Sequence, residues 1–266
     1  MLAVITGASS GIGAMFARKL AARGYDLLLV ARREDRLRSL AQELQDLYHL
    51  KVEAFAADLA HADDRERLAQ VVEAAPDLGL LVNNAGFGTN GYFLETDVRQ
   101  QLEMHELHVL ATVRLCHAAI RNLDGNDGAK RRGIINVSSV AAFSSAPQNA
   151  SYNSTKRWVN GFTESLAMEF GATGKSITVQ ALCPGFTLSE FHDKLKMDRS
   201  RIPRSLWMTA DFVVEESLKA FGKGKLFVIP GWRYKALVGV MKALPASVLS
   251  AATVRAARRY RHKRVE

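Results

Sequence analysis

The chain has 266 residues and a formal net charge of +9, and its 48% hydrophobic content supports one sizeable α/β core and excludes a chain disordered by composition. Its two cysteines are too few for a disulfide framework and no signal-peptide pattern opens the chain, so we expect a cytoplasmic protein. No zinc-finger spacing or aromatic-interleaved basic face is present, so we expect no nucleic-acid binding.

A strand, a glycine-rich turn and a helix open the chain. Leu2–Ile5 is a short run with β-branched residues, and Thr6–Gly13 then reads T-G-A-S-S-G-I-G. Gly7 permits a tight turn, Gly11 a close approach of the backbone to a pyrophosphate, and Gly13 close packing of helix on strand. The helix N-terminus adds N–H groups for phosphates. The turn therefore predicts a dinucleotide site with contacts from Gly7, Ser9, Ser10, Gly11, Ile12 and Gly13.

The second predicted strand, Asp26–Ala31, decides the expected cofactor. NAD sites usually place an acidic residue at the end of this strand to bond the ribose 2′-hydroxyl. This chain has Arg32 and Arg33 there, and arginine can pair with a 2′-phosphate. We therefore expect NADP(H) to be preferred over NAD(H), with Arg32 the first contact and Arg33 the second. The alternative is a pair of surface arginines that only begin a helix.

Strand and helix patterns alternate along the rest of the chain, with short connections. This alternation predicts an α/β fold with a doubly wound parallel sheet of about seven strands and helices on both faces. The other predicted strands are Val52–Ala56, Gly79–Val82, Ile134–Ser138, Ser176–Leu182 and Leu226–Ile229. The predicted helices are Ala14–Arg23, Glu34–Tyr48, His61–Ala75, Asp97–Ile120, Ser151–Phe170 and Ala210–Phe221. We expect one catalytic and cofactor-binding domain over residues 1–230, with an irregular lid or substrate loop at about residues 186–209.

A tyrosine and a lysine share one face of a predicted helix. Tyr152 and Lys156 are four residues apart, a little more than one turn. An ammonium near a phenol stabilises the phenolate, so we expect the pKa of Tyr152 to fall from ~10 toward a value useful for proton transfer. Ser139 follows the fifth predicted strand, where its hydroxyl could bond the substrate oxygen that Tyr152 protonates. Alone, this spacing is common on solvated helix faces, so its weight comes from the other motifs.

Four motifs together resemble those of the short-chain dehydrogenase/reductase family, of the type with a single Rossmann-like domain. Over roughly Leu2–Pro230 they follow in the family's order: the glycine turn, Asn83-Asn84-Ala85-Gly86, Ser139 with Tyr152 and Lys156, and Pro184-Gly185. The resemblance implies an NAD(P)-dependent oxidoreductase that transfers hydride between NADPH and a carbonyl or alcohol, without a metal. It also implies a homodimer or homotetramer built partly on the helices from Asp97 and Ser151.

The resemblance gives each matched position a role. Tyr152 would be the general acid in carbonyl reduction, Lys156 would lower its pKa and hold the nicotinamide ribose, and Ser139 would polarise the substrate carbonyl. Asp58 and Leu59 would contact the adenine, and Thr187 would approach the nicotinamide carboxamide. The remaining cofactor contacts would be Asn84, Ala85, Gly86, Pro184 and Gly185.

One position departs from the family pattern. The family usually places an asparagine on the long helix, and this chain has His108 there. In the family, the main-chain carbonyl of this residue holds a water that relays protons to the lysine, so the side-chain change need not abolish activity. Two interpretations stay open: His108 joins the relay, or it only fills the helix interface.

The carboxy-terminal residues, 231–266, are expected to form a helical extension with a basic tail. Lys235–Val254 is apolar but interrupted by Lys242 and Pro245, so we expect no membrane-spanning helix. Arg255–Glu266 carries a net charge of +5 and leaves +4 for the rest of the chain. Two short helices and the tail could contact an anionic membrane surface. Alternatively, they pack over the substrate cleft or a partner subunit.

Aromatic residues lie near the motif ends and in the predicted lid, so we expect an apolar small-molecule substrate; they are Phe87, Phe143, Phe186, Phe191 and Trp207. The main expectation is a carbonyl reductase or alcohol dehydrogenase. The alternatives are a non-catalytic dinucleotide-binding sensor or scaffold, which only His108 favours, and a membrane-surface reductase of lipid-like ketones.

Overall fold

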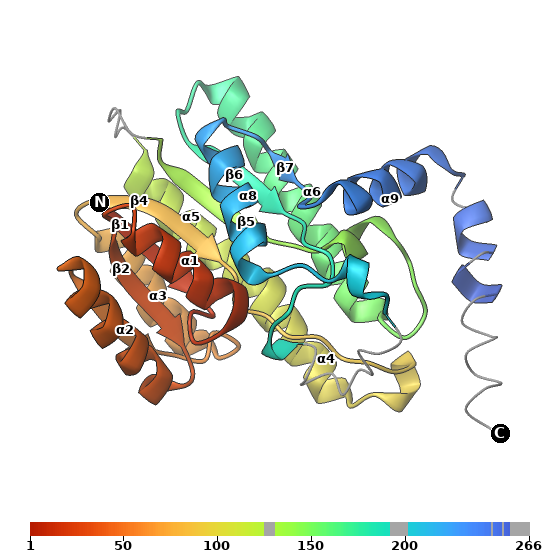
Figure 1. Cartoon of the computed structure of the whole chain (residues 1–266), viewed down its shortest axis with the longest axis horizontal. Helices are drawn as coiled ribbons and strands as arrows, with labels where there is room; N and C mark the ends of the chain where they lie inside the picture. The colour runs from red at the N-terminus through yellow and green to blue at the C-terminus, as the bar shows by residue number, and fades with distance from the viewer. Residues whose placement is uncertain (125–130, 192–201, 246, 252, 256–266) are drawn as a thin grey trace.

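A seven-stranded parallel sheet forms the centre of the protein in this computed structural model, which describes residues 1–124, 131–191, 202–245, 247–251 and 253–255. The strand order is β3-β2-β1-β4-β5-β6-β7 (Figure 1). The strands are β1 (Leu2–Thr6), β2 (Asp26–Ala31), β3 (Val52–Ala56), β4 (Leu78–Asn83), β5 (Gly133–Val137), β6 (Thr178–Leu182) and β7 (Phe227–Val228). The predicted doubly wound sheet of about seven strands is confirmed.

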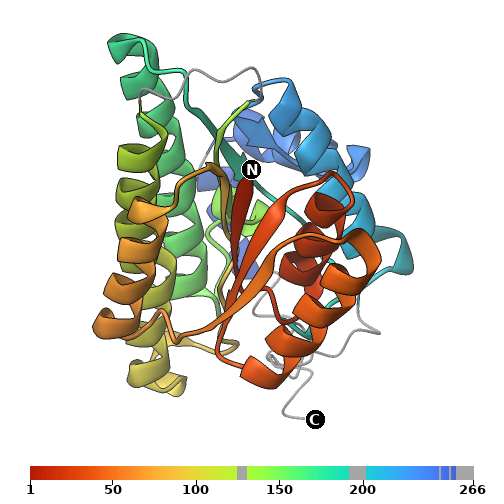
Figure 2. The same cartoon turned by 90° about the vertical axis from the view of Figure 1, so that its left-hand side faces the viewer.

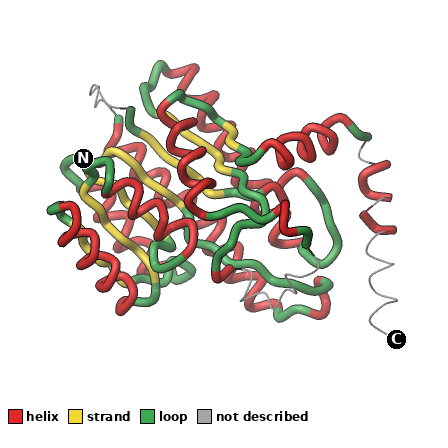
Figure 3. Tube along the Cα trace, viewed as in Figure 1, coloured by secondary structure: helices red, strands yellow, loops and turns green. Residues whose placement is uncertain are grey.

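Helices cover both faces of the sheet (Figures 2 and 3). One face carries α1 (Gly11–Ala21), α2 (Glu34–Tyr48) and α8 (Ala210–Gly222), and the other carries α3 (Ala62–Ala74), α5 (Ala111–Leu123) and α6 (Ala150–Thr173). Side chains of β1 alternate between the two cores, since Ala3 and Ile5 join the first and Val4 the second. Both faces are therefore buried, which explains why the strands read as continuous apolar runs.

The strand order reverses between β1 and β4, and this reversal positions the site. The chain moves from β1 outward to β3 and then returns to β4 on the other side of β1. The loops after β1 and β4 therefore diverge at the carboxyl edge of the sheet, which is where parallel α/β sheets bind ligands.

The predicted helix Asp97–Ile120 is wrong as a single α-helix. The structure has α4 (Val98–His105), a π-helical turn (Glu106–Leu110) and α5 in its place. A π turn widens the helix by one residue and is frequent at functional sites. Here its inward residue is His108, which is 2% exposed. Apolar periodicity does not distinguish a single widened turn from a regular one, so this turn was not predictable from the pattern.

The predicted start of the first helix at Ala14 is also wrong, because α1 begins at Gly11. The glycine turn therefore supplies the N–H groups of the first helical turn itself. Gly7 has φ +67°, and a Cβ at Gly13 would lie 2.3 Å from the carbonyl oxygen of Gly7. Only glycine fits this contact between helix and strand. The other predicted strands and helices differ from those observed by at most three residues at either end.

Short 3₁₀ helices, at Phe93–Glu95, Val140–Phe143 and Arg204–Leu206, complete the loops near the carboxyl edge. The predicted lid is only partly visible, because residues 192–201 lie outside the described residues, as does the basic tail from residue 256.

Helix α9 (Trp232–Ala243) extends away from the sheet, and a further helix, Ser247–Arg255, follows it (Figure 1). Tyr234 and Val238 are the buried residues of α9, whereas Trp232 at its start is 71% exposed. Among the described residues no single helix is long and apolar enough to cross a membrane; the two helices pass such a test together, but they are bent by 115° at their junction.

Candidate active site

A pocket of about 750 Å³ lies at the carboxyl edge of the sheet and collects nearly all the predicted site residues. The predicted residues that line it are Gly7, Ser9, Ser10, Gly11, Ile12, Arg32, Arg33, Asp58, Leu59, Asn84, Ala85, Gly86, Ser139, Tyr152, Lys156, Pro184, Gly185 and Thr187. Gly13 and His108 are not on its wall. Gly13 instead packs under the turn, and His108 lies behind Gly86, where a Cβ would come 2.7 Å from the imidazole Nε2.

The ends of β1 and β4 are joined by hydrogen bonds beneath the pocket. The Thr6 hydroxyl oxygen accepts from the backbone N–H groups of Asn84 and Ala85, both at 2.9 Å. The Asn84 side chain donates to the carbonyl oxygen of Thr6 at 2.9 Å. These bonds fix the glycine turn against the Asn-Asn-Ala-Gly segment. The result is a rigid, glycine-lined cradle at a helix N-terminus, which suits a pyrophosphate.

Ser139, Tyr152 and Lys156 meet on the opposite side of this pocket. Ser139 caps the 3₁₀ helix after β5, and its oxygen accepts from Ala141 N at 3.1 Å. Its hydroxyl also hydrogen-bonds to Tyr152. The Lys156 ammonium donates to the carbonyl oxygen of Val137 at 2.9 Å and lies 5.9 Å from the centroid of the Tyr152 ring. The Ser138 hydroxyl donates to the carbonyl oxygen of Lys156 at 3.0 Å, which ties β5 to α6.

The expected fall in the pKa of Tyr152 is contradicted. Burial raises the pKa of Tyr152 to about 12, because it disfavours the phenolate, and the hydrogen bond from Ser139 only partly opposes this. The Lys156 ammonium, which donates to the carbonyl oxygen of Val137, does not offset this effect of burial. Burial in turn lowers the pKa of Lys156 to about 8. Tyr152 is therefore a protonated donor at neutral pH, and Lys156 is close to its titration point.

His108 is fixed by a chain of hydrogen bonds that leads to Tyr152. Its Nδ1 lies 2.9 Å from the Thr155 hydroxyl, and that hydroxyl donates to the carbonyl oxygen of Tyr152 at 3.0 Å. Since the threonine proton is used in that bond, Nδ1 of His108 carries the proton that Thr155 accepts. Nε2 is then an acceptor, and it has no hydrogen-bond partner among the described residues. Burial, followed by the nearby charge of Lys156, lowers the pKa of His108 well below its usual range, so the ring is neutral.

The two arginines after β2 have different environments. Arg32 has a side chain that is 65% exposed, with one contact at 3.3 Å to Asp58. Arg33 instead donates to the hydroxyls of Ser9 and Ser10, at 3.0 Å each, and to the Glu190 carboxylate at 2.8 Å. The Arg32 side chain is therefore more exposed and has fewer contacts than that of Arg33.

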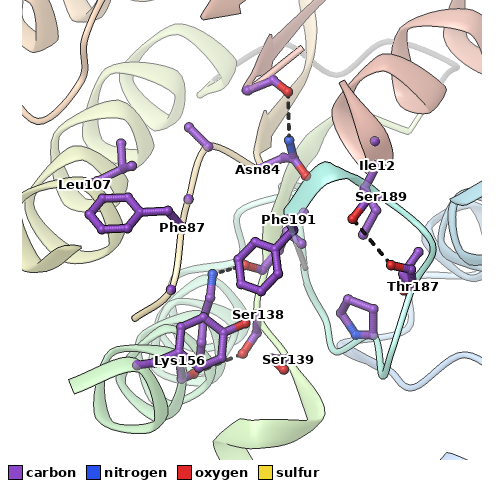
Figure 4. A pocket seen from close by; sticks show the side chains of 18 of the residues that line it. Ile12, Asn84, Phe87, Leu107, Ser138, Ser139, Lys156, Thr187, Ser189 and Phe191 are labelled. Atoms are coloured by element: carbon purple, nitrogen blue, oxygen red, sulfur yellow. Dashed lines mark hydrogen bonds between the residues drawn. The ribbon is translucent and has the colours of Figure 1, made fainter. Parts of the chain in front are cut away.

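The segment after β6 forms a further wall of the pocket. The Thr187 hydroxyl donates back to the carbonyl oxygen of Gly185 at 3.0 Å, and Ser189 places a second hydroxyl on the same wall. Figure 4 shows both residues across the pocket from Phe87 and Leu107, with Phe191 above Lys156. Of the predicted aromatic contacts, Phe87, Phe186 and Phe191 line the pocket, whereas Phe143 and Trp207 do not.

Sequence reasoning missed several residues that shape this site. Thr6 is the first residue of the glycine-turn motif and Ser138 ends the fifth predicted strand, so their positions were usable signals although no role was predicted for either. Thr155 lies inside the Tyr-x-x-x-Lys span, but that pattern does not predict a contact with His108. Glu190 gave no signal, because it lies in a stretch without periodicity and its partners are more than 150 residues away in the chain.

No group of three or more histidine, cysteine, aspartate or glutamate side chains that could hold a metal ion occurs within the described ranges. The residues that line the pocket instead offer the phenol of Tyr152, the hydroxyl of Ser139, the ammonium of Lys156 and the glycine turn that can hold phosphates. This donor set fits a nicotinamide dinucleotide lying from the glycine turn to Tyr152.

Comparison with known proteins agrees with this fit. The structure superposes on a short-chain dehydrogenase from Sphingobium yanoikuyae in complex with NADPH, with a TM-score of 0.81, 32% identity, and coverage of 91% of this chain and 93% of the other. A short-chain dehydrogenase/reductase from Burkholderia phymatum in complex with NAD matches with a TM-score of 0.78 and 25% identity, covering 89% and 91%. The 7beta-hydroxysteroid dehydrogenase of Collinsella aerofaciens is 29% identical over 240 residues, or 90% of this chain and 89% of the relative.

The short chain dehydrogenase family profile matches residues 1–200. With the fold, the pocket and these similarities in agreement, the chain belongs to the short-chain dehydrogenase/reductase family and is an oxidoreductase with a single Rossmann-type domain.

Proposed function

We propose that this protein is an NADPH-preferring reductase of apolar carbonyl compounds, or dehydrogenase of the matching alcohols, with Tyr152 as general acid and base. The observation that carries this proposal is the meeting of Ser139, Tyr152 and Lys156 in the same pocket as the glycine turn. Its test is NADPH consumption by the purified protein with a panel of apolar ketones and aldehydes. Binding of NADPH without turnover of any substrate would favour the sensor or scaffold alternative.

The nicotinamide cofactor supplies the hydride in reduction and accepts it in oxidation. The protein orients the carbonyl and delivers the proton. The Ser139 hydroxyl holds the substrate oxygen beside the Tyr152 phenol, and that phenol donates its proton as the oxygen becomes negative. Because burial keeps the phenol protonated, the resting enzyme is ready for reduction. Lys156 places a positive charge beside the phenolate that results.

The return of a proton to Tyr152 gives His108 a role in this proposal. Its acceptor atom Nε2 and the Lys156 ammonium lie 2.7 and 3.7 Å from one point, the position of a Cβ on Gly86. A neutral imidazole there can accept a hydrogen bond from the lysine side of the site, directly or through water. The other interpretation, that His108 only packs, predicts no effect on proton transfer.

The preference for NADPH rests on Arg32. Its exposed guanidinium and single long contact let it turn toward a 2′-phosphate, and such pairs with arginine are strong. Arg32→Ala should weaken NADPH binding about tenfold or more while leaving NADH binding nearly unchanged. Equal losses for the two cofactors would show that Arg32 does not read the phosphate.

An apolar substrate is supported by the pocket wall near Tyr152. Phe191 lies 5.9 Å from the Tyr152 ring between centroids, and Leu237 and Met241 of α9 line the same pocket. The relative from Collinsella aerofaciens, named for a hydroxysteroid, is consistent with a bulky apolar substrate. Steroid alcohols and ketones are therefore a useful first panel.

A homo-oligomer in the cytoplasm is the proposed setting. The helices α4 and α5 and the π turn between them expose Val98, Leu102, Leu110 and Val113, and Met168 on α6 is 67% exposed. Exposed apolar residues on these helices suit a subunit interface. Light scattering after gel filtration would test it: a dimer or tetramer that Leu102→Glu dissociates would support this interface, and a monomer would exclude it.

A second candidate is a reductase of lipid-like ketones at a membrane surface. The observation that favours it is α9, which lines the pocket through Leu237 while exposing Trp232 and Val240. Co-sedimentation with vesicles that contain anionic lipid, compared for the wild type and a Trp232→Ser/Val240→Ser variant, separates the two candidates. Equal co-sedimentation of the wild type and the variant would exclude membrane binding through α9.

A further inference from the structure

Residues 186–191, here called the crossing segment, run along the pocket from the end of β6 to the end of β2. Five of these six residues line the pocket, all except Leu188. Midway, Ser189 packs on the glycine turn, since a Cβ at Gly11 would lie 3.0 Å from the Ser189 Cβ. The segment therefore lies beside the place where a dinucleotide would meet the N-terminus of α1.

Backbone hydrogen bonds hold the first end of the crossing segment. The Phe186 carbonyl oxygen accepts from Met208 N, and Leu188 N donates to the Met208 carbonyl oxygen, both at 2.9 Å. Phe186 N also donates to the Tyr234 hydroxyl at 3.0 Å. This end is attached to the body of the protein through main-chain atoms and a buried tyrosine.

Two ion pairs hold the second end. The Glu190 carboxylate pairs with Arg33 at 2.8 Å and with Arg36 at 2.5 Å, one arginine to each oxygen. These two guanidinium groups lower the pKa of Glu190 to about 2, so the carboxylate is charged at any ordinary pH. The side chains of all three residues are between 31% and 46% exposed, so salt should weaken this attachment.

Both arginines already have protein partners in this structure. Arg33 already donates through Nε and Nη2 to the serines of the glycine turn and through Nη1 to Glu190. Arg36 does not line the pocket. Arg32 remains the arginine able to turn toward a 2′-phosphate. The pair of Glu190 with Arg33 therefore joins two walls of the pocket, and the pair with Arg36 attaches Glu190 to α2.

We propose that Glu190 is a positioning residue that latches the crossing segment to Arg33 and Arg36 beside the bound dinucleotide and thereby sets how fast the cofactor leaves. This inference rests on the proposed function, because it requires a nicotinamide dinucleotide in the pocket. The latch consists of protein side chains alone, so it retains NADPH and NADH to the same degree. Opening it breaks both ion pairs while the first end of the segment stays attached.

The test is the release rate of each cofactor from the full-length protein, measured by displacement in a stopped-flow fluorimeter. Glu190→Gln and Arg36→Gln should each speed the release of NADPH and of NADH about two- to fivefold, as expected for partly exposed ion pairs. The double variant should release no faster than Glu190→Gln, because both changes remove the same interaction. Arg38→Gln is the matched control: it breaks the ion pair with Glu34 on the outer face of α2 and should leave release unchanged.

Ionic strength gives a second readout that a merely structural role would not move. Added salt should speed release from the wild type and have a smaller effect on Glu190→Gln. Wild-type release rates in Glu190→Gln, or faster release of NADPH alone, would overturn the latch; the latter would make Glu190 part of the phosphate site. Failure of the wild type to bind either cofactor would instead refute the proposed function.

Discussion

The two sides of the pocket are built in different ways. The cofactor side is built from main-chain geometry: a turn with Gly7 at positive φ, a helix that begins at Gly11, and a contact that only Gly13 permits. The proton-transfer side is built from buried polar side chains brought from β5, the π turn and α6, among them Ser139, His108 and Lys156. On the cofactor side, a side chain added at Gly7 or Gly13 would overlap neighbouring atoms. The proton-transfer side depends instead on the charge and hydrogen bonding of its side chains. Different substitutions should therefore disable each side.

The largest expected effect is on the proton-transfer side. Tyr152→Phe keeps the ring and removes the transferable proton, so turnover should fall about 10²- to 10⁴-fold. NADPH binding should stay within about twofold of the wild type, since the loss is confined to a general acid. Steady-state kinetics and a fluorescence titration on the same preparation check both statements. Near-normal turnover would refute the proposed mechanism.

On the cofactor side, Gly13→Ala should act through packing. Its Cβ would lie 2.3 Å from the Gly7 carbonyl oxygen, so helix and turn must move apart. We expect a loss of about 1–3 kcal/mol in the free energy of unfolding, together with weaker cofactor binding.

The matched control is Gly161→Ala on an exposed face of α6, where nothing lies within 4 Å of the new Cβ. It should stabilise the protein by about 0.4–1 kcal/mol. Urea unfolding of both variants measures the difference. Equal stabilities would show that the turn is looser than the structure indicates.

The pH dependence of reduction should report Lys156. Its pKa of about 8 means that it is charged below that pH and neutral above it. If its charge assists Tyr152, kcat/KM for reduction should fall about tenfold per unit on the alkaline side of pH 8. His108 is neutral through burial and adds no titration near neutrality. A profile that stays flat well above pH 8 would remove Lys156 from the proton-transfer step.

His108 should give the smallest effect on turnover, and two variants test its Nε2 atom. Leucine fills much of the same space without a polar atom, whereas glutamine places a polar atom near the position of Nε2. If Nε2 serves proton return, His108→Leu should lower kcat about tenfold and change the solvent isotope effect, and His108→Gln should retain more activity. Full activity with an unchanged isotope effect in His108→Leu would leave His108 a packing residue.

How much the sequence could predict follows the same division. Local patterns predict the glycine turn, the strands and the spacing of Tyr152 and Lys156, because each of these features depends on residues close together in the chain. The π turn at His108 and the pKa of Tyr152 were not predictable in this way, because both depend on burial among residues distant in the chain. Glu190 was invisible for the same reason. Its partners Arg33 and Arg36 follow β2, whereas Glu190 itself follows β6. These two strands are far apart both along the chain and in the strand order.

The most direct test of this account is a paired fluorescence titration of the wild-type protein with NADPH and NADH. We predict that NADPH binds at least about tenfold more tightly, as a paired 2′-phosphate would require. Equal binding would contradict the role of Arg32 and the cofactor preference. Binding of neither would contradict the assignment of the pocket as a dinucleotide site, on which the proposed activity depends.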